Sequence, residues 1–508
     1  MKMLWMRRKN SAPGPTNRIP HWTSLLLPLT LAIILTGRSA ELTAINRRHA
    51  RVAPEWLKQA TIYQVWLRSF SSQGTLKAVT ARLPYLADLG VTFVYLSPFM
   101  KGPHPFKVSD YYALNPEHGS EEDLKALISE AHRLKLKVMM DVVFYHSALD
   151  NVLMKDPENY MRTGEGKIQL GYFALPRLNF ENPELRTYLI KSLIHWVEDF
   201  GVDGFRCDVS GGVPLPFWEE ARAALDQVKP DLILLAECDM PEEQLKAFDI
   251  SYNYPFYYFP LVAVFQKGEP ASSLIEHWER ARAAFPQGAR FLHFSDNHDQ
   301  PRAVMLFSQK GALAAGVLNF TLDGIPFLYN GQEVGDPAPT AWETDAGSVI
   351  KLPATMDAAA PNGDEETWIA FKRLFQMRRE EAALTSGELI WISNTRPQSV
   401  LSFLRRKSAK ADNAGLVYDW PNKQVPPLNA GDEEILVVIN LSNRKELTVV
   451  GLPWTDYKPM QDLMKKDRQV RVPIQESKLV FNLGAFEFVV AKRLPPQTID
   501  PLVAPQPK

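Results

Sequence analysis

The chain has 508 residues, which exceeds the size of an ordinary single domain but fits a large α/β barrel that carries a smaller second domain. Its 57 Lys and Arg residues nearly balance 58 Asp and Glu residues, so the formal net charge is -1. This balance gives no reason to expect a nucleic acid or an anionic membrane surface as partner, and it suits a neutral small molecule.

Residues 1–40 are predicted to be a signal peptide. Basic residues precede a short apolar run from Leu25 to Leu35, and this run is shorter than the roughly 20 apolar residues that cross a bilayer. Cleavage near Ala40 would export the mature protein to the periplasm or the medium. Because Arg38 stands where a small residue is usual, a membrane anchor made by the uncleaved signal is the alternative. No stable membrane span is expected after cleavage.

Residues 41–384 are predicted to form a catalytic (β/α)8 barrel. Apolar, β-rich runs alternate with helical patterns between about Gln59 and Phe375, which is typical of parallel strands joined by helices. Eight such runs favour a closed TIM barrel over an open sheet. The runs are TIYQVWL (61–67), VTFVYLSP (91–98), KVMMDVVFYH (137–146), VDGFRCDV (202–209), DLILLAEC (231–238), FDISYNY (248–254), RFLHFSDNHD (290–299) and IPFLYNGQE (325–333).

Two of the intervening helices have clear start signals. Ser120 can cap the first, with Asp123 completing a capping box, and apolar residues follow at helical spacing. The second begins at Asn182 and Pro183. We therefore expect helices from about residue 121 and from about residue 183.

Three further segments complete the predicted organisation. Residues 147–181, after the third strand run, form a polar, glycine-containing insertion that is too long for a simple loop. Residues 385–494 show short alternating runs such as EILVVINLS and FEFVVAKRL, which predict a C-terminal antiparallel β-sandwich domain. Residues 495–508 are proline-rich and are predicted to be a disordered tail.

Ionisable residues gather where the middle strand runs end. In (β/α)8 barrels the loops that follow the strands meet at one face, so side chains at these ends converge. An isolated Arg-x-Asp in a strand is more often a structural ion pair, but several neighbouring strand ends carrying carboxylates favour a catalytic site. The residues concerned are Asp141, His146, Arg206, Asp208, Glu237, Asn297, His298 and Asp299.

Facing carboxylates suit glycoside hydrolysis, in which one carboxylate is ionised and another holds a proton for the leaving oxygen. Arg206 and Asp208 point to the same face of an extended strand, so Arg206 favours the charged form of Asp208, as a nucleophile requires. Glu237 has no cationic partner in its own segment, and repulsion from neighbouring carboxylates would keep it protonated, as a general acid requires. The pattern thus assigns a nucleophile and an acid.

The segments DVVFYH, GFRCD, LLAEC and SDNHD occur in this order along the predicted barrel. They resemble the four main motifs of the α-amylase family of glycoside hydrolases, family 13, and the resemblance covers roughly Thr61 to Glu333. It implies a nucleophile, an acid/base residue and a third carboxylate that holds the sugar, together with side chains that bind this sugar. These are, for catalysis, Asp208, Glu237 and Asp299, and, for substrate binding, Phe106 in place of a stacking tyrosine, His146, Arg206 and His298.

The chain departs from the family pattern at three places. Tyr145 stands where many members have a calcium-binding asparagine, and SSQGTLKAV after the first strand lacks an acidic calcium loop, so we expect no metal there and no cofactor. Ser210 to Gly212 replace a lysine-histidine pair that shapes the leaving-group side in many members. Cys207 and Cys238 do not provide a disulfide framework, and each is expected to be a small buried residue, with a disulfide between them as the alternative.

The resemblance implies a retaining hydrolase of α-1,4-glucosidic bonds in starch-like glucans or maltooligosaccharides, acting through a covalent glycosyl-enzyme intermediate. Such a mechanism requires the two main carboxyl groups to lie about 5–5.5 Å apart. The same carboxylates could instead serve an α-glucan transglycosylase or isomerase, for example a trehalose-forming enzyme. A third alternative is a non-catalytic binding ectodomain of the kind found in transporter heavy chains. The oligomeric state stays open.

Overall fold

The computed structural model describes residues 45–340, 349–353, 358, 364–408, 431–451, 460–465, 469–470, 474–475 and 478–493. The predicted signal peptide, residues 1–40, and the predicted tail, residues 495–508, lie outside the described residues. Within them, only helix α10 (Ala303–Thr321) has the length and apolar composition of a membrane span, and 67% of its most apolar stretch is buried inside the fold.

Eight parallel strands close into a barrel, as predicted. The barrel order is β1-β10-β9-β8-β7-β6-β5-β2, and each strand lies within one of the eight apolar runs of the sequence. These strands are buried on both faces, which explains why their sequences are continuously apolar. Their bounds are β1 (Ile62–Val65), β2 (Phe93–Leu96), β5 (Lys137–Val142), β6 (Gly204–Cys207), β7 (Ile233–Ala236), β8 (Ile250–Tyr252), β9 (Phe291–His293) and β10 (Ile325–Tyr329).

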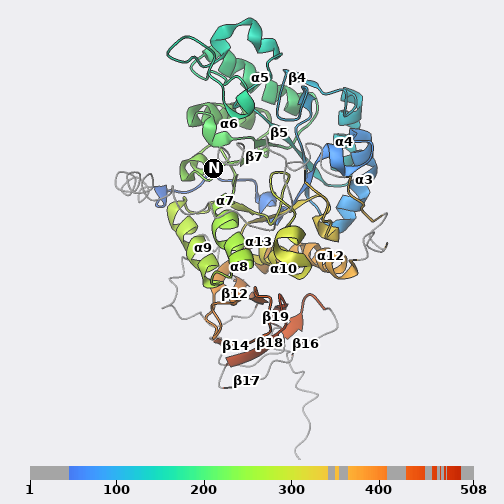
Figure 1. Ribbon diagram of the computed structural model, residues 1–508, viewed down its shortest axis with the longest axis vertical. Helices are drawn as coiled ribbons and strands as arrows, with labels where there is room; N and C mark the ends of the chain where they lie inside the picture. The colour runs from blue at the N-terminus through green and yellow to red at the C-terminus, as the bar shows by residue number, and fades with distance from the viewer. Residues whose placement is uncertain are drawn as a thin grey trace, which may run out of the picture.

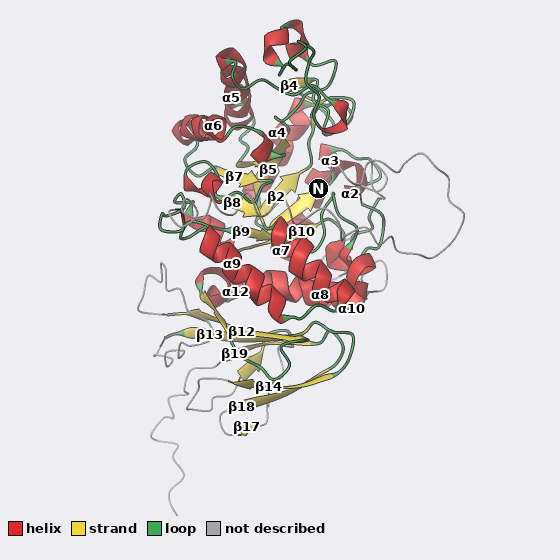
Figure 2. Cartoon of the chain, turned by 60° about the vertical axis from the view of Figure 1, so that its left-hand side comes forward, coloured by secondary structure: helices red, strands yellow, loops and turns green. Residues whose placement is uncertain are grey.

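Helices surround this barrel (Figures 1 and 2). The main ones are α3 (Leu76–Leu89), α4 (Glu121–Arg133), α5 (Pro183–Glu198), α6 (Leu215–Val228), α9 (Ser272–Ala284), α10 and α12 (Glu365–Glu380). Shorter helical elements are α2 (Leu67–Phe70), α7 (Tyr254–Phe256), α8 (Val262–Lys267), α13 (Ala382–Ser386), η3 (Glu55–Gln59), η7 (Ser210–Gly212), η8 (Pro241–Leu245), the π-helix η9 (Tyr257–Leu261) and η10 (Gln332–Val334).

The two predicted helix starts are confirmed. The Ser120 side chain accepts a hydrogen bond from the Asp123 amide at 3.3 Å, and the Asp123 carboxylate accepts one from the Ser120 amide at 3.1 Å, which together form a capping box for α4. The Asn182 side chain accepts hydrogen bonds from the first amides of α5, which begins at Pro183. These caps satisfy helix-terminal amides that would otherwise lack partners.

Two segments extend beyond the strand ends on one side of the barrel. A hairpin of β3 (Met100–Lys101) and β4 (Asp110–Leu114) follows β2. Residues 147–181 contain only short helices, η4 (Val152–Lys155), η5 (Pro157–Asn159) and η6 (Tyr172–Ala174), and isolated bridges such as Tyr160 with Leu178 hold them together. Figure 1 shows this region at the end of the molecule opposite the C-terminal sheets.

The C-terminal part is an antiparallel β-sandwich, as predicted. One sheet has the order β11-β12-β13-β19-β15-β16 and the other β14-β18-β17. A second apolar core lies between them, and α8, α10 and α12 separate them from the barrel strands (Figure 2). The strands are β11 (Glu388–Trp391), β12 (Val400–Lys407), β13 (Glu433–Asn440), β14 (Glu446–Gly451), β15 (Met460–Asp462), β16 (Gln469–Val470), β17 (Ile474–Gln475), β18 (Lys478–Leu483) and β19 (Phe488–Arg493).

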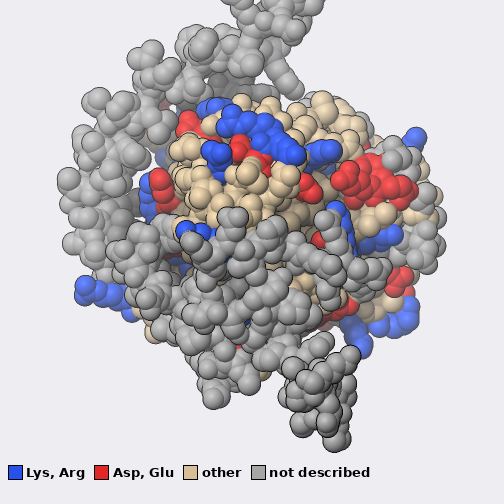
Figure 3. Space-filling model, turned by 90° about the horizontal axis from the view of Figure 1, so that it is seen from below, with Lys and Arg blue, Asp and Glu red and all other residues tan. Residues whose placement is uncertain are grey.

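A buried arginine links the two parts. Arg405 on β12 donates hydrogen bonds to the carbonyl of Thr321, at the end of α10, at 2.9 Å and to that of Gly387 at 2.8 Å. On the face seen from the sandwich end, basic and acidic side chains of the described residues are interspersed (Figure 3), in keeping with the small net charge.

Candidate active site

Four charged side chains lie side by side at the C-terminal ends of β5, β6 and β7. Strand pairing places Asp141 of β5 opposite Arg206 of β6, and Cys207 of β6 opposite Ala236 of β7. Asp208 and Glu237 are the next residues on their strands, so the register brings them to neighbouring positions. The face of the barrel predicted to carry chemistry therefore does bring these residues together.

Arg206 is the centre of this group, and its side chain is fully buried. Its Nη1 donates hydrogen bonds to both oxygens of Asp141, at 2.9 and 3.0 Å, and to Oδ1 of Asp208 at 2.8 Å. Its Nη2 lies 2.9 Å from Oε1 of Glu237. Burial lowers the pKa of Arg206, but the carboxylates of Asp141 and Glu237 outweigh this effect and raise it well above its ordinary value. The guanidinium therefore stays charged.

Within its own segment Glu237 has no cationic partner, as stated from the sequence, but the structure brings one from the neighbouring strand. Arg206 belongs to the preceding strand, and the pairing of β6 with β7 brings its second nitrogen to Glu237. The Glu237 carboxylate also accepts hydrogen bonds from the Val209 amide at 2.7 Å and from the Tyr254 hydroxyl at 3.3 Å. Val209 has a φ of 46°, an uncommon conformation for a β-branched residue, directly after Asp208. Contacts with Arg206, the Val209 amide and the Tyr254 hydroxyl thus fix the position of the Glu237 carboxylate.

Asp141 fixes the position of the Arg206 side chain through its hydrogen bonds. The Tyr95 hydroxyl donates to Oδ2 of Asp141 at 2.5 Å, so this carboxylate is bonded by both Tyr95 and Arg206. Burial raises the pKa of Asp141, while Arg206 and Tyr95 oppose the shift by stabilising the charged form. Since Asp141 is fully buried, its role is to orient the arginine.

His298 and Asp299 follow β9 and form a second group. Nε2 of His298 lies 3.6 Å from Oδ1 of Asp299, and the Asn297 side chain accepts a hydrogen bond from the Asp299 amide at 2.8 Å. Nδ1 of His298 pairs with the amide nitrogen of Gln64 at 2.8 Å. Asn297 also donates to the Tyr254 hydroxyl at 3.4 Å, and Tyr254 contacts Glu237, so Tyr254 joins the two groups.

An aromatic wall borders the second group. The Phe106 ring lies 5.5 Å from the His298 ring at an interplanar angle of 18°, and the Trp66 ring lies 5.1 Å from it at 11°. His146, at the end of β5, is buried, and its Nε2 pairs with the Phe106 carbonyl oxygen at 2.9 Å. Phe106 and His298 are therefore neighbours. His146 joins them by its hydrogen bond to the Phe106 carbonyl.

Sequence reasoning missed the residues that support this site. Trp66, Gln64 and Tyr95 lie inside apolar strand runs, where only the register of the closed barrel shows which side chains face the site. Tyr254 belongs to the aromatic segment YNYPFYYFP, at the end of the sixth strand run. No short-range pattern indicates its bond to Glu237.

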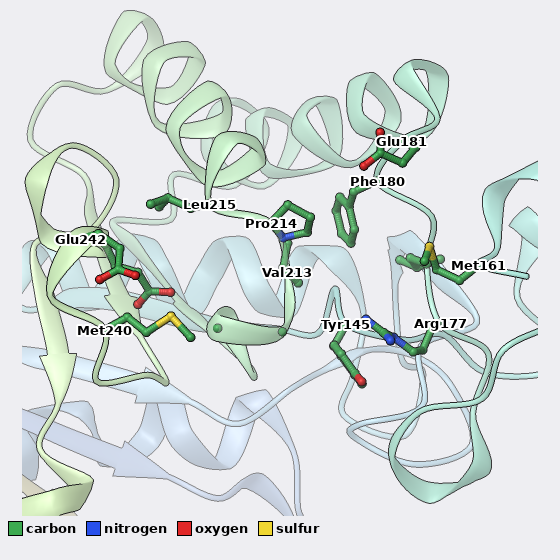
Figure 4. A pocket seen from close by; sticks show the side chains of 14 residues that line it. Tyr145, Met161, Arg177, Phe180, Glu181, Val213, Pro214, Leu215, Met240 and Glu242 are labelled. Carbon is green, nitrogen blue, oxygen red and sulfur yellow. The ribbon is translucent and has the colours of Figure 1, made fainter. Parts of the chain in front are cut away.

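A cavity of about 450 Å³ opens beside Glu237. A second cavity, of about 330 Å³, shares part of its lining and extends toward Phe180, Met240 and Glu242 (Figure 4). Both are bordered by the insertion and by the η7 segment. The residues common to the two linings are Tyr145, Arg177, Gly211 and Gly212.

The two cysteines are free thiols, so the alternative of a disulfide between them is wrong. Cys207 is buried, as predicted. Cys238 is only half-buried, which differs from the prediction, and it lines the cavity beside Glu237 although alternation along a strand would turn it away. Because β7 ends at Ala236, the alternation of side chains along a strand no longer applies at Cys238.

Tyr145, where the sequence predicts no calcium, lies in close contact with the insertion and with η7. A side chain at Gly171 or at Gly212 would begin 2.6 Å from the Tyr145 ring, and the Arg177 guanidinium lies 4.8 Å from the ring centre. Within the described ranges no cluster of three or more His, Cys, Asp or Glu side chains could hold a metal ion. The absence of calcium at residue 145 stays a prediction. A thermal midpoint that falls on addition of a chelator and recovers with calcium would count against it.

Glu243, on the wall of the second cavity, gives a pH prediction. Burial raises its pKa to about 8, although contact with Ser210 opposes the shift. The folded protein then keeps this proton up to about pH 8, whereas the unfolded chain releases it near the ordinary value of 4.5. The stabilisation linked to this group is complete below about pH 4.5 and is lost as the pH rises to about 8. We expect Glu243→Gln to flatten the fall of the thermal midpoint over this range.

The measurement is the thermal midpoint of both proteins between pH 4.5 and pH 8.5. Glu242→Gln is the matched control, because Glu242 is the adjacent carboxylate on the same cavity wall but is only half-buried. This control should keep the slope of the wild type. An unchanged slope in Glu243→Gln would contradict the prediction.

The chain is similar to known amylases in sequence and in fold. The family model of the alpha amylase catalytic domain matches residues 46–162 and 160–367. The alpha-amylase MalA of Haloarcula japonica is 30% identical over 423 residues, which cover 79% of this chain but 58% of that protein. The intracellular maltogenic amylase of Bacillus subtilis is 27% identical over 411 residues, 70% of this chain and 68% of the relative. The crystal structure of a noncanonic maltogenic alpha-amylase, AmyB from Thermotoga neapolitana, superposes with a TM-score of 0.72 at 28% identity, covering 86% of this chain and 100% of that one.

Proposed function

The chain belongs to the α-amylase family of glycosidases, and on this premise we propose that it is a retaining hydrolase of α-1,4-linked glucans or maltooligosaccharides. One observation carries the proposal: Asp208 and Glu237 contact different nitrogens of the single guanidinium of Arg206. Sharing one planar group draws the two carboxylates together. This supports the short separation of about 5–5.5 Å that retaining enzymes use, rather than the wider gap that admits a water in inverting enzymes.

In the proposed first step, Asp208 attacks the anomeric carbon while Glu237 gives its proton to the leaving oxygen. The bond from the anomeric carbon to this oxygen breaks, and an ester to Asp208 forms. Arg206 stabilises the ionised Asp208 before the attack. Glu237, which gives the proton in this step, is buried, with a side chain that is 5% exposed.

In the proposed second step, Glu237 takes a proton from water as the water attacks the anomeric carbon and releases Asp208. The contacts of Glu237 with Arg206 and the Val209 amide favour its carboxylate form, which this step requires. We assign Asp299, with His298, to binding the hydroxyls of the sugar at the cleavage point. Phe106 and Trp66 provide the aromatic wall beside it.

The cavity beside Glu237, of about 450 Å³, leaves room for a sugar on the leaving-group side. The cavity beside Glu237 is bordered by η7, where Ser210 to Gly212 carry small side chains or none. Maltooligosaccharides and longer α-1,4-linked glucans therefore both stay within the proposal.

The test is incubation of the purified protein with maltoheptaose, followed by analysis of product chain lengths, with Asp208→Asn as the control. The proposal expects shorter maltooligosaccharides from the wild type alone. Products longer than the substrate or a non-reducing disaccharide would show that transfer or isomerisation replaces hydrolysis. An absence of turnover on maltoheptaose and on other α-glucans would contradict the proposal and leave a binding protein.

We also propose export of the mature protein, supported by the basic and apolar pattern of residues 1–40. Sequencing of the N-terminus of the protein recovered from the periplasm or the medium tests it. A chain found only in the cytoplasm with residues 1–40 intact would contradict export.

A further inference from the structure

The turn at residues 171–174 of the insertion has an unusual backbone. Phe173 has φ 54° and ψ 22°, and Ala174 has φ 55°, so two consecutive residues with a Cβ atom adopt the left-handed conformation. This conformation is unfavourable for any residue except glycine and, to a lesser degree, asparagine or aspartate. Such strain persists only where the surrounding structure imposes it, and it concentrates at ligand clamps and active sites.

The strained turn places two aromatic side chains against Tyr145 and His146, in the loop that follows β5. The Tyr172 ring lies 5.1 Å from the ring of Tyr145, and Tyr172 lines the cavity that contains Glu237. The Phe173 ring lies 6.4 Å from the ring of His146 in an edge-on arrangement. Tyr172 therefore lies beside Tyr145, on the side of the Glu237 cavity. Phe173 lies beside His146, on the side of Phe106.

Burial does not account for Phe173. Its side chain is 47% exposed, so the ring contributes only part of its apolar surface to the fold. A glycine would adopt the same backbone without strain, and a polar residue would suit the exposed position. The neighbouring Gly171 also fits a built turn, because a Cβ there would lie 2.6 Å from the Tyr145 ring. The exposed ring is thus explained better by a ligand than by packing.

We propose that Tyr172 and Phe173 form an aromatic clamp that holds the glucan across the cleavage point. Tyr172 contacts the sugar on the leaving-group side, in the cavity beside Glu237, and Phe173 contacts the sugar on the other side, next to His146. Aromatic rings stack on the apolar faces of sugar rings, and they lose little conformational freedom when they do so. This inference rests on the proposed α-glucan hydrolysis and assigns residues that position its substrate.

The clamp predicts a particular kinetic signature. Stacking stabilises the bound substrate and the transition state equally. Its loss therefore raises KM while kcat stays nearly constant. We expect Phe173→Leu to raise KM for maltoheptaose about tenfold, the scale of one aromatic contact. Phe173→Tyr, which keeps a flat ring, should retain a KM close to that of the wild type.

Two further variants separate a clamp from a structural role. Phe173→Gly relieves the left-handed backbone, so it should keep the thermal midpoint of the wild type while it raises KM as Phe173→Leu does. Leu170→Ala is the matched control, because Leu170 is an exposed apolar residue of the same segment, at 53% exposure, and it pairs with Pro176 within the insertion. It should leave KM unchanged.

Different experimental outcomes would contradict the clamp and the proposed function. If the wild type hydrolyses maltoheptaose but Phe173→Leu has an unchanged KM, the clamp is wrong and the hydrolase stands. A Phe173→Gly variant with a lowered thermal midpoint would assign the ring to packing and would also overturn the clamp. If the wild type hydrolyses no α-glucan, the proposed function fails, and the clamp fails with it.

Discussion

Replacing Glu237 with Gln is expected to abolish hydrolysis of maltoheptaose, and azide is expected to restore turnover of α-glucosyl fluoride by the same variant. General acid catalysis contributes roughly 10²–10⁴-fold, so the loss on maltoheptaose should reach about 10³-fold. Fluoride leaves without a proton from the enzyme, so Asp208 can still form the glucosyl ester. Hydrolysis of this ester then stalls because no base activates the water.

Azide is an anion that needs no base, so it can attack the stalled ester and release Asp208. Asp208→Asn is the matched control, since it has no nucleophile and azide cannot rescue it through the ester. The measurement is fluoride release with and without azide, followed by the configuration of the azide product, which should be α. Identical behaviour of the two variants would contradict the assignment of Glu237 as acid and base and Asp208 as nucleophile.

The second large effect concerns Arg206. Arg206→Met would leave Asp141, Asp208 and Glu237 buried together without a cation, and loss of one partner of a buried ion pair costs about 3–5 kcal/mol of folding stability. In the wild type, burial raises the pKa of Asp141 and Arg206 opposes this shift. Removing the arginine leaves burial unopposed, so the pKa of Asp141 should rise further.

The pH dependence of this effect has a definite sign. A carboxyl whose pKa is raised in the folded state contributes stability that is complete at low pH and is lost as the pH rises through its folded pKa. The deficit of Arg206→Met in urea unfolding should therefore be larger at pH 8 than at pH 4. Arg206→Lys retains the charge but not the planar fork that contacts three carboxylates, so it should recover part of the stability while activity stays low. An equal deficit at both pH values would contradict this account of the cluster.

The barrel could be predicted because each strand is a continuous apolar run of strand length, bounded by polar or turn residues. The same reasoning grouped the candidate site residues, since Asp208 and Glu237 follow directly after such runs. The hairpin of β3 and β4 was not predicted, because β3 has only two residues and too few side chains to show alternation.

What the sequence could not show depends on contacts between distant segments. The approach of Arg206 to Glu237 follows from the register between β6 and β7, and no pattern within one strand reveals it. The space around Tyr145 is likewise made by Gly171 and Gly212, which lie on separate segments and lack side chains that would collide with its ring. A glycine that is needed only to leave room for another side chain does not belong to a repeating pattern of apolar and polar residues in the sequence.

The most direct test of the account is the anomeric configuration of the first products formed from maltoheptaose. Proton NMR, recorded before mutarotation equilibrates the new reducing ends, distinguishes the two anomers. A double displacement through an ester to Asp208 predicts that the α-anomer appears first. If the β-anomer appears first, water attacks the substrate directly, and the pairing of Asp208 with Glu237 around Arg206 does not form a retaining site.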